Sequence, residues 1–356
     1  MKIVGIGDFL IPCSDLENAF KRLEGTDIET EVIEWKLKDY EELQKINLLI
    51  EQGGREQYEP DEGVMAAIRD ADMIVTQFCP MTKKVLDSCE KLKAIGVLRA
   101  GVENINVEYA TEKGVLVFNT PGRNANAVAD FTVGMMISEC RNIAKSHMEM
   151  KAGNWVRDYA NAASVPDLCD KTVGIVGYGN IGRKVAQRLK GFEMNIVAYD
   201  PFVSQEKSDV KMVSLEELMA CSDFVTIHSR MTKETYHMVD KDMLAKMKPT
   251  AYLINTARSG LVDEDALYEC LKAKKIAGAA LDVFDLEPPG ATYKMIPLDN
   301  VTVTPHLAGG TRDAFSYSPV LLLKELQKLW FEKKSTHYLM NGKECADHPW
   351  LQGLTR

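Results

Sequence analysis

The chain has 356 residues, of which 46% are hydrophobic and 27% charged, a composition typical of a folded protein with room for more than one domain. Its formal net charge is −9, so no nucleic-acid partner is expected, because a phosphate backbone would be repelled. The eight cysteines show neither a Cys-x-x-Cys pair nor zinc-ligand spacing, and no apolar run approaches the roughly 18 residues of a membrane helix. We therefore expect no metal site, no membrane span, and free thiols in the cytoplasm.

The first third of the chain alternates short β-rich runs with amphipathic stretches. This alternation predicts a parallel sheet covered by helices on both faces, in the manner of a flavodoxin-like unit. Apolar residues recur at helical spacing over 16–23 and 40–50. The expected strands are 2–6, 31–35, 73–76, 94–97 and 115–118.

The segment 125–147 is predicted to form one long helix. Ala127, Val128, Phe131 and Met135 make it apolar on more than one face. A helix of this kind is buried. Two interpretations are open: the helix belongs to an ordinary domain core, or it lies in an interface between domains or subunits.

A second α/β unit is expected after the polar loop 154–170. Helices are predicted over 183–189 and 264–274, and a last long helix over 315–333. The expected strands are 172–176, 195–199, 224–228, 251–254, 277–281 and 301–304. The predicted fold class is therefore α/β, with two doubly wound parallel-sheet domains.

A glycine-rich turn follows the expected strand 172–176. Gly177, Gly179 and Gly182 have the spacing G-x-G-x-x-G, and a helix is expected to follow. Gly177 permits a tight turn, Gly179 lets the backbone approach a pyrophosphate, and Gly182 allows close helix–strand packing. Asp200 closes the next strand, where a carboxylate accepts hydrogen bonds from ribose hydroxyls and repels a 2′-phosphate. The segment predicts a Rossmann site for NAD rather than NADP.

Three residues with acid–base or anion-binding chemistry follow later strands. Arg258 could bind a carboxylate through two hydrogen bonds, and His306 could exchange a proton near neutral pH. Glu287 could orient the histidine ring and favour its protonated form. The carboxyl ends of parallel strands bind ligands, so a common site is possible. Spacing alone does not show that they meet, and a lone arginine at a strand end is more often a surface cation.

Taken together, these motifs resemble the D-isomer-specific 2-hydroxyacid dehydrogenases, which include phosphoglycerate, glycerate and D-lactate dehydrogenases. The resemblance rests on the glycine turn with Asp200, Asn-Thr-Ala-Arg258, Phe-Asp-x-Glu287-Pro and Thr-Pro-His306, in the family's order. It extends to the segments starting at Asn119 and at Arg99, and covers residues 70–330. The chain looks like a phosphoglycerate dehydrogenase without a regulatory domain.

The resemblance implies an NAD-dependent oxidoreductase that interconverts a small D-2-hydroxy acid and its 2-keto acid. Arg258, Glu287 and His306 would be the catalytic residues, with His306 as general acid and base. It also implies a discontinuous substrate-binding domain, 1–121 plus 308–356, and a Rossmann domain, 122–307, with a cleft that closes on substrate. A homodimer is expected, with the long helix at its interface.

The same resemblance assigns the binding residues. The loop after the fourth expected strand would offer backbone N–H groups to the substrate carboxylate, although it is shorter than in the family. These substrate-binding residues are Arg99, Ala100, Gly101 and Val102, together with Arg258. The cofactor-binding residues are Gly177, Tyr178, Gly179, Asn180, Ile181, Gly182, Asp200, His228, Thr256, Ala257 and Asp282.

The identity of the substrate is left open. Additional arginines, Arg99, Arg157 and Arg230, suggest D-3-phosphoglycerate as an alternative. For Arg157 and Arg230 a position on the surface is the other interpretation. An alternative of a different class is an NADH-sensing corepressor, which would bind NADH but turn over 2-keto acids slowly. Formate or phosphite oxidation on the same scaffold is a third possibility. The expected partner is a small-molecule 2-hydroxy or 2-keto acid.

Overall fold

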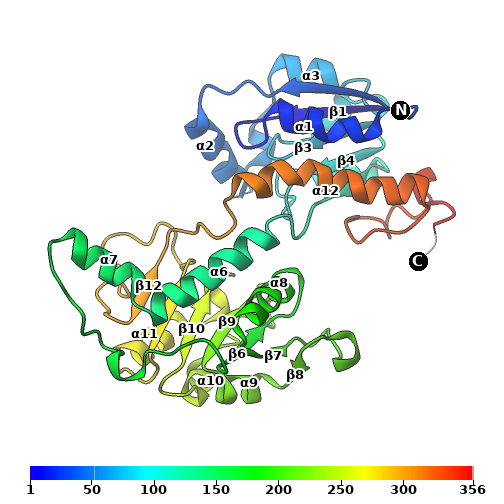
Figure 1. The fold of residues 1–356 in the computed structure, drawn as a ribbon. Helices are drawn as coiled ribbons and strands as arrows, with labels where there is room; N and C mark the ends of the chain where they lie inside the picture. Colours follow the sequence, from blue (N-terminus) through cyan, green and yellow to red (C-terminus); the bar gives the residue numbers. More distant parts are fainter. Residues whose placement is uncertain (52, 355–356) are drawn as a thin grey trace. The chain divides into compact units, whose positions relative to one another are not determined.

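The computed structural model describes residues 1–51 and 53–354, and the chain divides into two compact units (Figure 1). Unit 1 consists of Met1–Arg123 and Thr311–Arg356, and unit 2 of Asn124–Gly310. The chain therefore leaves unit 1, completes unit 2 and returns. Each unit is described by itself.

Unit 1 is built on a five-stranded sheet whose paired strands are all parallel, in the order β2-β1-β3-β4-β5. This is the strand order of the flavodoxin-like fold, which confirms the predicted class. The strands are β1 (Lys2–Gly7), β2 (Glu29–Glu34), β3 (Met73–Thr76), β4 (Ala94–Val97) and β5 (Leu116–Phe118).

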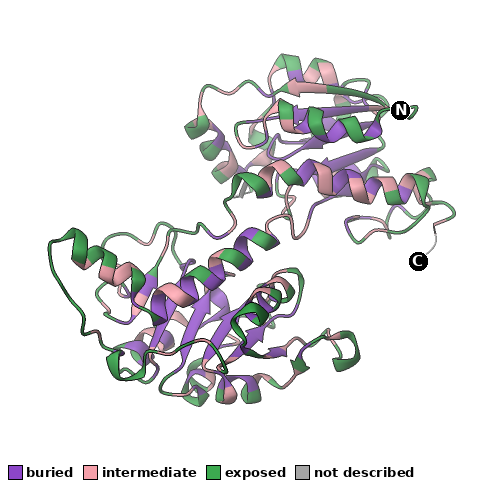
Figure 2. Cartoon of the chain, viewed as in Figure 1, coloured by how far each residue is buried: buried purple, intermediate pink, exposed green. Residues whose placement is uncertain are grey.

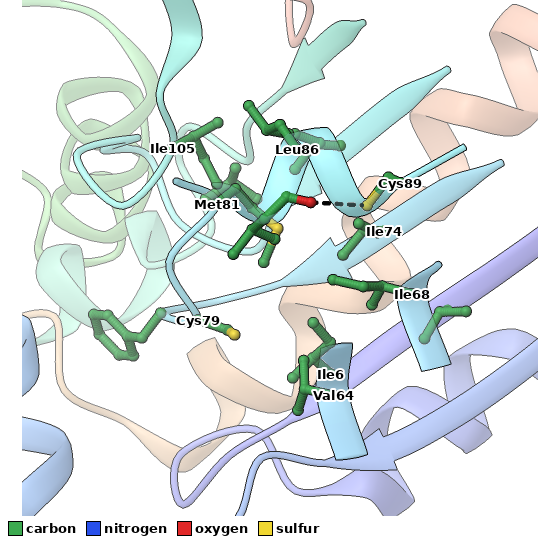
Figure 3. Close-up of a cluster of buried hydrophobic side chains, with 14 of the residues drawn as sticks. Ile6, Val64, Ile68, Ile74, Cys79, Met81, Leu86, Cys89 and Ile105 are labelled. Atoms are coloured by element: carbon green, nitrogen blue, oxygen red, sulfur yellow. Dashed lines mark hydrogen bonds between the residues drawn. The ribbon is translucent and has the colours of Figure 1, made fainter. Parts of the chain in front are cut away.

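Alternate residues of these strands feed two hydrophobic clusters, because successive side chains point to opposite faces of a sheet. On one face, Ile6 and Ile74 pack against helical side chains that include Val64 and Leu86 (Figure 3). On the other face, Leu16 joins residues of α12. The helices are α1 (Cys13–Phe20), α2 (Tyr40–Glu51), α3 (Glu62–Ile68), α4 (Lys83–Ser88), α5 (Val107–Glu112) and α12 (Arg312–Phe331).

The segment after α12 binds the free edge of β5. Met340 donates its backbone N–H to Val117 at 2.8 Å, and Asn119 donates to the Tyr338 carbonyl at 2.9 Å. The buried Asn341 side chain accepts from the Val117 N–H at 2.9 Å. The C-terminal part of the chain thus protects the sheet edge from further pairing.

Unit 2 contains a seven-stranded sheet with the order β12-β11-β10-β9-β6-β7-β8. Its paired strands are parallel, and the order reverses between β6 and β9, as in a Rossmann fold. The short β8 was not predicted. The strands are β6 (Thr172–Val176), β7 (Asn195–Tyr199), β8 (Lys211–Met212), β9 (Phe224–Ile227), β10 (Tyr252–Asn255), β11 (Gly278–Leu281) and β12 (Val301–Val303).

Helices cover both faces of this sheet. One hydrophobic cluster joins strand residues such as Val176 to Leu218 and Leu244, and the other joins Ile175 to Met136 and Val185. The helices are α6 (Ala125–Cys140), α7 (Ile143–Lys151), α8 (Asn180–Leu189), α9 (Leu215–Cys221), α10 (Lys241–Lys246) and α11 (Glu264–Lys272). Among the described residues, no helix combines the length and hydrophobicity needed to cross a membrane.

The predicted single helix over 125–147 is wrong, because the structure has two helices there. Asn142 separates α6 from α7 with a left-handed backbone, φ 56°, which asparagine adopts more readily than most residues. Its side chain donates to Asn161 Oδ1 at 2.7 Å, and this hydrogen bond stabilises the turn between the two helices. Many residues of α6 are buried in the core of unit 2, whereas α7 has none buried (Figure 2). The core interpretation therefore applies to α6.

Candidate active site

The glycine turn after β6 requires glycine at two positions for different steric reasons. Gly177 has φ 94°, and a Cβ on it would lie 2.6 Å from the Ser229 nitrogen. A Cβ on Gly182 would collide with the Gly177 carbonyl oxygen. A Cβ on Gly179, by contrast, would meet nothing within 4 Å. The turn is therefore tightly packed at Gly177 and Gly182 and open at Gly179.

The open side of the turn presents the N-terminus of α8. Gly179 is its N-cap, and no side chain caps the first turn. Uncapped N–H groups at the start of a helix form an anion site. Beside them, Asp200 accepts from the backbone N–H of Tyr178 through Oδ2 and of Phe202 through Oδ1, both at 2.9 Å. The structure thus fixes a carboxylate next to the uncapped start of α8, and the contact of Asp200 with the ribose of NAD stays a prediction.

The Tyr178 side chain stabilises the structure around the glycine turn. Its hydroxyl donates to Asp209 Oδ1 at 2.5 Å, and the Arg183 guanidinium lies 4.6 Å from its ring centre. Hydrogen bonds from Lys190 and Tyr178 lower the pKa of Asp209 to about 2. The buried ring anchors the glycine turn, so only the backbone of Tyr178 remains for a cofactor.

His228 directly follows β9, beside the glycine turn. Its N–H donates to the Val176 carbonyl at 2.7 Å, and its Nε2 lies 2.9 Å from Thr226 Oγ1. The residue is partly exposed, but Nδ1 is buried, and desolvation lowers the pKa of His228 to about 3. Its ring is therefore neutral at physiological pH, which fits packing beside a cofactor rather than a second catalytic base.

Glu287 and His306 form a hydrogen-bonded pair. His306 Nδ1 lies 2.7 Å from Glu287 Oε2, and Glu287 Oε1 accepts from the Phe284 N–H at 3.1 Å. The side chains are 47% and 38% exposed, so the pair is open to a ligand. His306 has φ 53°, a conformation that residues other than glycine seldom adopt. The carboxylate holds Nδ1 and thereby fixes the orientation of the ring.

Asp282 clamps the segment that carries His306. This fully buried residue follows β11. Its Oδ1 accepts from Thr304 Oγ1 at 2.6 Å and from the Leu307 N–H at 2.9 Å, and its Oδ2 accepts from the Ala308 N–H at 2.9 Å. The sequence suggested a cofactor contact for Asp282, which stays a prediction, but did not reveal this clamp.

Arg258 lies in a turn that Asn255 shapes. The Asn255 side chain donates to the Arg258 carbonyl at 2.9 Å and accepts from the Ala257 N–H at 3.0 Å. Thr256, the other predicted residue in this turn, is buried and lies 2.8 Å from Thr132 through their hydroxyls. The guanidinium of Arg258 donates to the Ala257 carbonyl at 2.7 Å.

The three predicted catalytic residues follow three neighbouring strands. Arg258 comes after β10, Glu287 after β11, and His306 after β12, and these strands are adjacent in the sheet. Parallel strands end at a common edge, where open α/β sheets bind ligands. The arrangement offers a cation for a carboxylate and an oriented histidine for proton transfer. Within residues 1–51 and 53–354, no cluster of His, Cys, Asp or Glu is placed to hold a metal ion.

The predicted substrate loop belongs to unit 1, directly after β4. The Arg99 carbonyl accepts from the Thr120 N–H at 3.0 Å, and the Ala100 carbonyl accepts from Asn119 Nδ2 at 2.6 Å. The guanidinium of Arg99 is held by Asn47 Oδ1 at 3.0 Å and by Glu103 at 2.9 Å. The loop is thus braced internally, and substrate binding by Arg99–Val102 stays a prediction.

Arg157 and Arg230, whose roles the sequence left open, are both exposed. The Arg230 carbonyl accepts from Thr235 Oγ1 at 2.7 Å, so its backbone is fixed within the loop after β9.

Comparison with known proteins extends these observations. Residues 133–308 match the family model "D-isomer specific 2-hydroxyacid dehydrogenase, NAD binding domain". The chain is 40% identical over 273 residues to D-3-phosphoglycerate dehydrogenase of Methanocaldococcus jannaschii, covering 75% of this chain and 51% of that protein. It is 37% identical over 276 residues to hydroxypyruvate reductase of Thermotoga maritima, covering 77% and 89%. The solved structure of D-2-hydroxyisocaproate dehydrogenase aligns with TM-score 0.71 and 26% identity, over 96% of this chain and 100% of that one.

The glycine turn and the matching family model define unit 2 as an NAD-binding Rossmann domain. The chain belongs to the D-isomer specific 2-hydroxyacid dehydrogenase family. It spans about half the length of the archaeal phosphoglycerate dehydrogenase that it matches.

Proposed function

We propose that the protein is an NAD-dependent oxidoreductase that interconverts a small D-2-hydroxy acid and its 2-keto acid. The observation that carries the proposal is the His306–Glu287 pair at 2.7 Å, on the strand edge that also presents Arg258. Residues of these types suit reversible proton transfer at a carbonyl beside a carboxylate.

NAD fits the residues of unit 2. The open space at Gly179 and the uncapped start of α8 suit a pyrophosphate held by the backbone of Tyr178, Asn180 and Ile181. Asp200 suits the ribose hydroxyls. We propose further cofactor contacts from His228, Thr256, Ala257 and Asp282. When bound, NAD donates or accepts the hydride.

The protein residues supply the proton and the orientation. In reduction, His306 Nε2 gives a proton to the carbonyl oxygen as C2 gains the hydride, and the products are the 2-hydroxy acid and oxidised NAD. In oxidation, Nε2 takes the hydroxyl proton. Glu287 keeps the ring in one orientation and stabilises its charged form. Arg258 binds the substrate carboxylate through two hydrogen bonds.

The test is NADH oxidation with a panel of 2-keto acids, with His306→Asn as the variant and the exposed His337→Asn as its control. Loss of a general acid lowers rates by about 10²- to 10⁴-fold, so His306→Asn is expected to lose at least about 100-fold in kcat while binding NADH as before. Absence of turnover by the wild-type protein on the whole panel, with NADH still bound, would contradict the proposal.

D-3-phosphoglycerate is a second candidate substrate. It is favoured by the 40% identity to a protein named D-3-phosphoglycerate dehydrogenase. Phosphohydroxypyruvate therefore belongs in the panel, and a kcat/KM well above that for hydroxypyruvate would select this candidate.

We further propose a homodimer built on α7 and the loop after it. Ile143, Met148 and Met150 on this unburied helix, and Trp155 beyond it, are all more than half exposed. Exposed apolar side chains in this number on one short segment suit burial against a second copy of the chain. Light scattering is expected to give the mass of a dimer, which Met148→Lys weakens and the control Met340→Lys does not. A monomeric wild-type protein would overturn this proposal.

A cytoplasmic location is also proposed. It is supported by the cysteines, all of which have free thiols in the structure, as expected in a reducing compartment.

A further inference from the structure

The loop between β11 and β12 carries Glu287 and contains neither a helix nor a strand. It covers residues 282–300, all of them within unit 2. The Glu287 side chain is partly exposed, so packing alone does not fix its position. The place of its carboxylate beside His306 therefore depends on what holds the loop.

Two contacts fasten this loop to the start of α11. Glu264, the first residue of the helix, accepts the Asp285 N–H through Oε2 at 3.4 Å, and its Oε1 lies 3.4 Å from Lys294 Nζ. Lys294 also pairs with Asp265, the next residue of the helix. Asp285 and Lys294 lie on either side of Glu287 in the sequence, so a single carboxylate holds both arms of the loop.

Glu264 is partly shielded from water and is not needed to cap its helix. Its side chain is 17% exposed, and that of Lys294 is 30% exposed. Salt weakens such partly buried ion pairs less than it weakens pairs on the surface. Asp263 caps α11 by accepting the Ala266 N–H at 2.9 Å. The Glu264 carboxylate is thus available to the loop.

An aromatic contact lies next to this ion pair. Tyr293, which precedes Lys294, packs edge-to-face against Phe284 with ring centres 5.2 Å apart. The Phe284 N–H donates to Glu287 Oε1 at 3.1 Å. Burial and the nearby charge of Glu264 raise the pKa of Tyr293. The Glu264 carboxylate is therefore close to the residues that position Glu287.

We propose that Glu264 and Lys294 are positioning residues that hold the Glu287 carboxylate against His306 Nδ1. The contacts run from Lys294 through Glu264 to the Asp285 N–H, and from there along the backbone to Glu287. The inference rests on the proposed function, and it names residues that control the orientation of the proton donor.

The test measures 2-keto acid reduction by Glu264→Ala, with the exposed Glu269→Ala on the same helix as its control. A misplacement of about 1 Å can cost about 100-fold, so kcat of Glu264→Ala is expected to fall about 10- to 100-fold. Its Kd for NADH should stay near the wild-type value. Lys294→Met should lower kcat in the same way. Its control is Lys272→Met, which removes another lysine beside the same Tyr268 ring and should leave kcat unchanged.

A double-mutant cycle separates positioning from a general structural role. If Glu264 acts through Glu287, the double variant Glu264→Ala/Glu287→Gln should be no slower than Glu287→Gln alone. Residues that act independently would give losses that multiply. Lys294→Met enters the same cycle, so the test does not depend on the folding of Glu264→Ala.

A second readout needs no turnover. The NMR signal of the proton on His306 Cε1, assigned by its loss in His306→Asn, reports the surroundings of the ring. Glu264→Ala and Lys294→Met are both expected to move this signal in the direction in which Glu287→Gln moves it. Glu269→Ala should leave it in place.

Three results would overturn the inference: a wild-type kcat in Glu264→Ala and Lys294→Met, losses that multiply with that of Glu287→Gln, or an unmoved His306 signal. Failure of the proposed function is distinguishable, because the wild-type protein would then turn over no 2-keto acid. In that case the NMR signal decides alone. Movement in both variants supports the positioning role, and a signal that stays in place overturns it.

Discussion

Replacing Asp282 by asparagine tests how the structure holds its histidine. The buried carboxylate accepts three hydrogen bonds, from the Thr304 hydroxyl and from the Leu307 and Ala308 N–H groups, at 2.6 to 2.9 Å. Asparagine keeps the shape but turns one acceptor oxygen into an NH2 donor. Whichever way the amide is oriented, a donor then faces a donor.

The size of the effect follows from these contacts. A hydrogen bond to a charged group contributes about 1.5–3 kcal/mol, and a buried donor left unsatisfied costs about 1–3 kcal/mol. Asp282→Asn is therefore expected to lower the free energy of unfolding of unit 2 by about 3 kcal/mol. The turn at His306, which has an uncommon φ of 53°, loses its support. A misplacement of about 1 Å can cost about 100-fold, so kcat should fall about 10- to 100-fold.

Urea unfolding and steady-state kinetics measure the two effects, with the exposed Asp347→Asn as control. The Kd for NADH separates the possible roles of Asp282. A positioning role alone leaves Kd within about twofold, whereas the predicted cofactor contact raises it further. A variant that keeps both wild-type stability and wild-type kcat would refute the clamp.

Three other changes have defined outcomes. Gly182→Ala places a methyl group against the Gly177 carbonyl oxygen, so NADH affinity measured by fluorescence should fall at least about tenfold. Asp8→Asn removes a carboxyl group whose pKa is raised by burial from 3.8 to about 6. Between these pH values the folded state holds a proton that the unfolded state has lost, so the free energy of unfolding of the wild-type protein should fall by about 3 kcal/mol as pH rises from 4 to above 6. Urea titrations of the variant should lack this fall. Lys145→Met leaves the buried Glu139 without its 2.8 Å partner, and the unfolding midpoint should reveal a loss of about 3–5 kcal/mol.

Most strands could be predicted from the sequence because their signal is local. Runs such as Met73–Thr76 and Thr172–Val176 are continuous buried apolar segments bounded by turn residues, and the structure gives them the predicted limits. The break at Asn142 is different. The apolar pattern of α6 runs up to it, and the Asn142 side chain is bonded to Asn161, 19 residues further along the chain. A local pattern does not carry such a contact.

The candidate site also has one part that the sequence could predict and one part that it could not. The glycine turn and Asp200 are recognisable because spacing alone encodes their geometry, and the structure brings Glu287 and His306 together as the motifs suggested. The clamp by Asp282 joins two loops that the sequence separates.

The division of the chain has a consequence for the order of folding. Leu322, Leu326 and Leu329 of α12 belong to the same core cluster as Ile3 and Leu16, although residues 124–310 separate them in the sequence. Synthesis starts with unit 1, but unit 1 cannot complete this core until α12 has left the ribosome. Unit 2 is continuous and emerges whole before that point, so it is free to fold first and shorten the loop that unit 1 must close. Until then, the apolar face of the N-terminal sheet stays open to water and to chaperones.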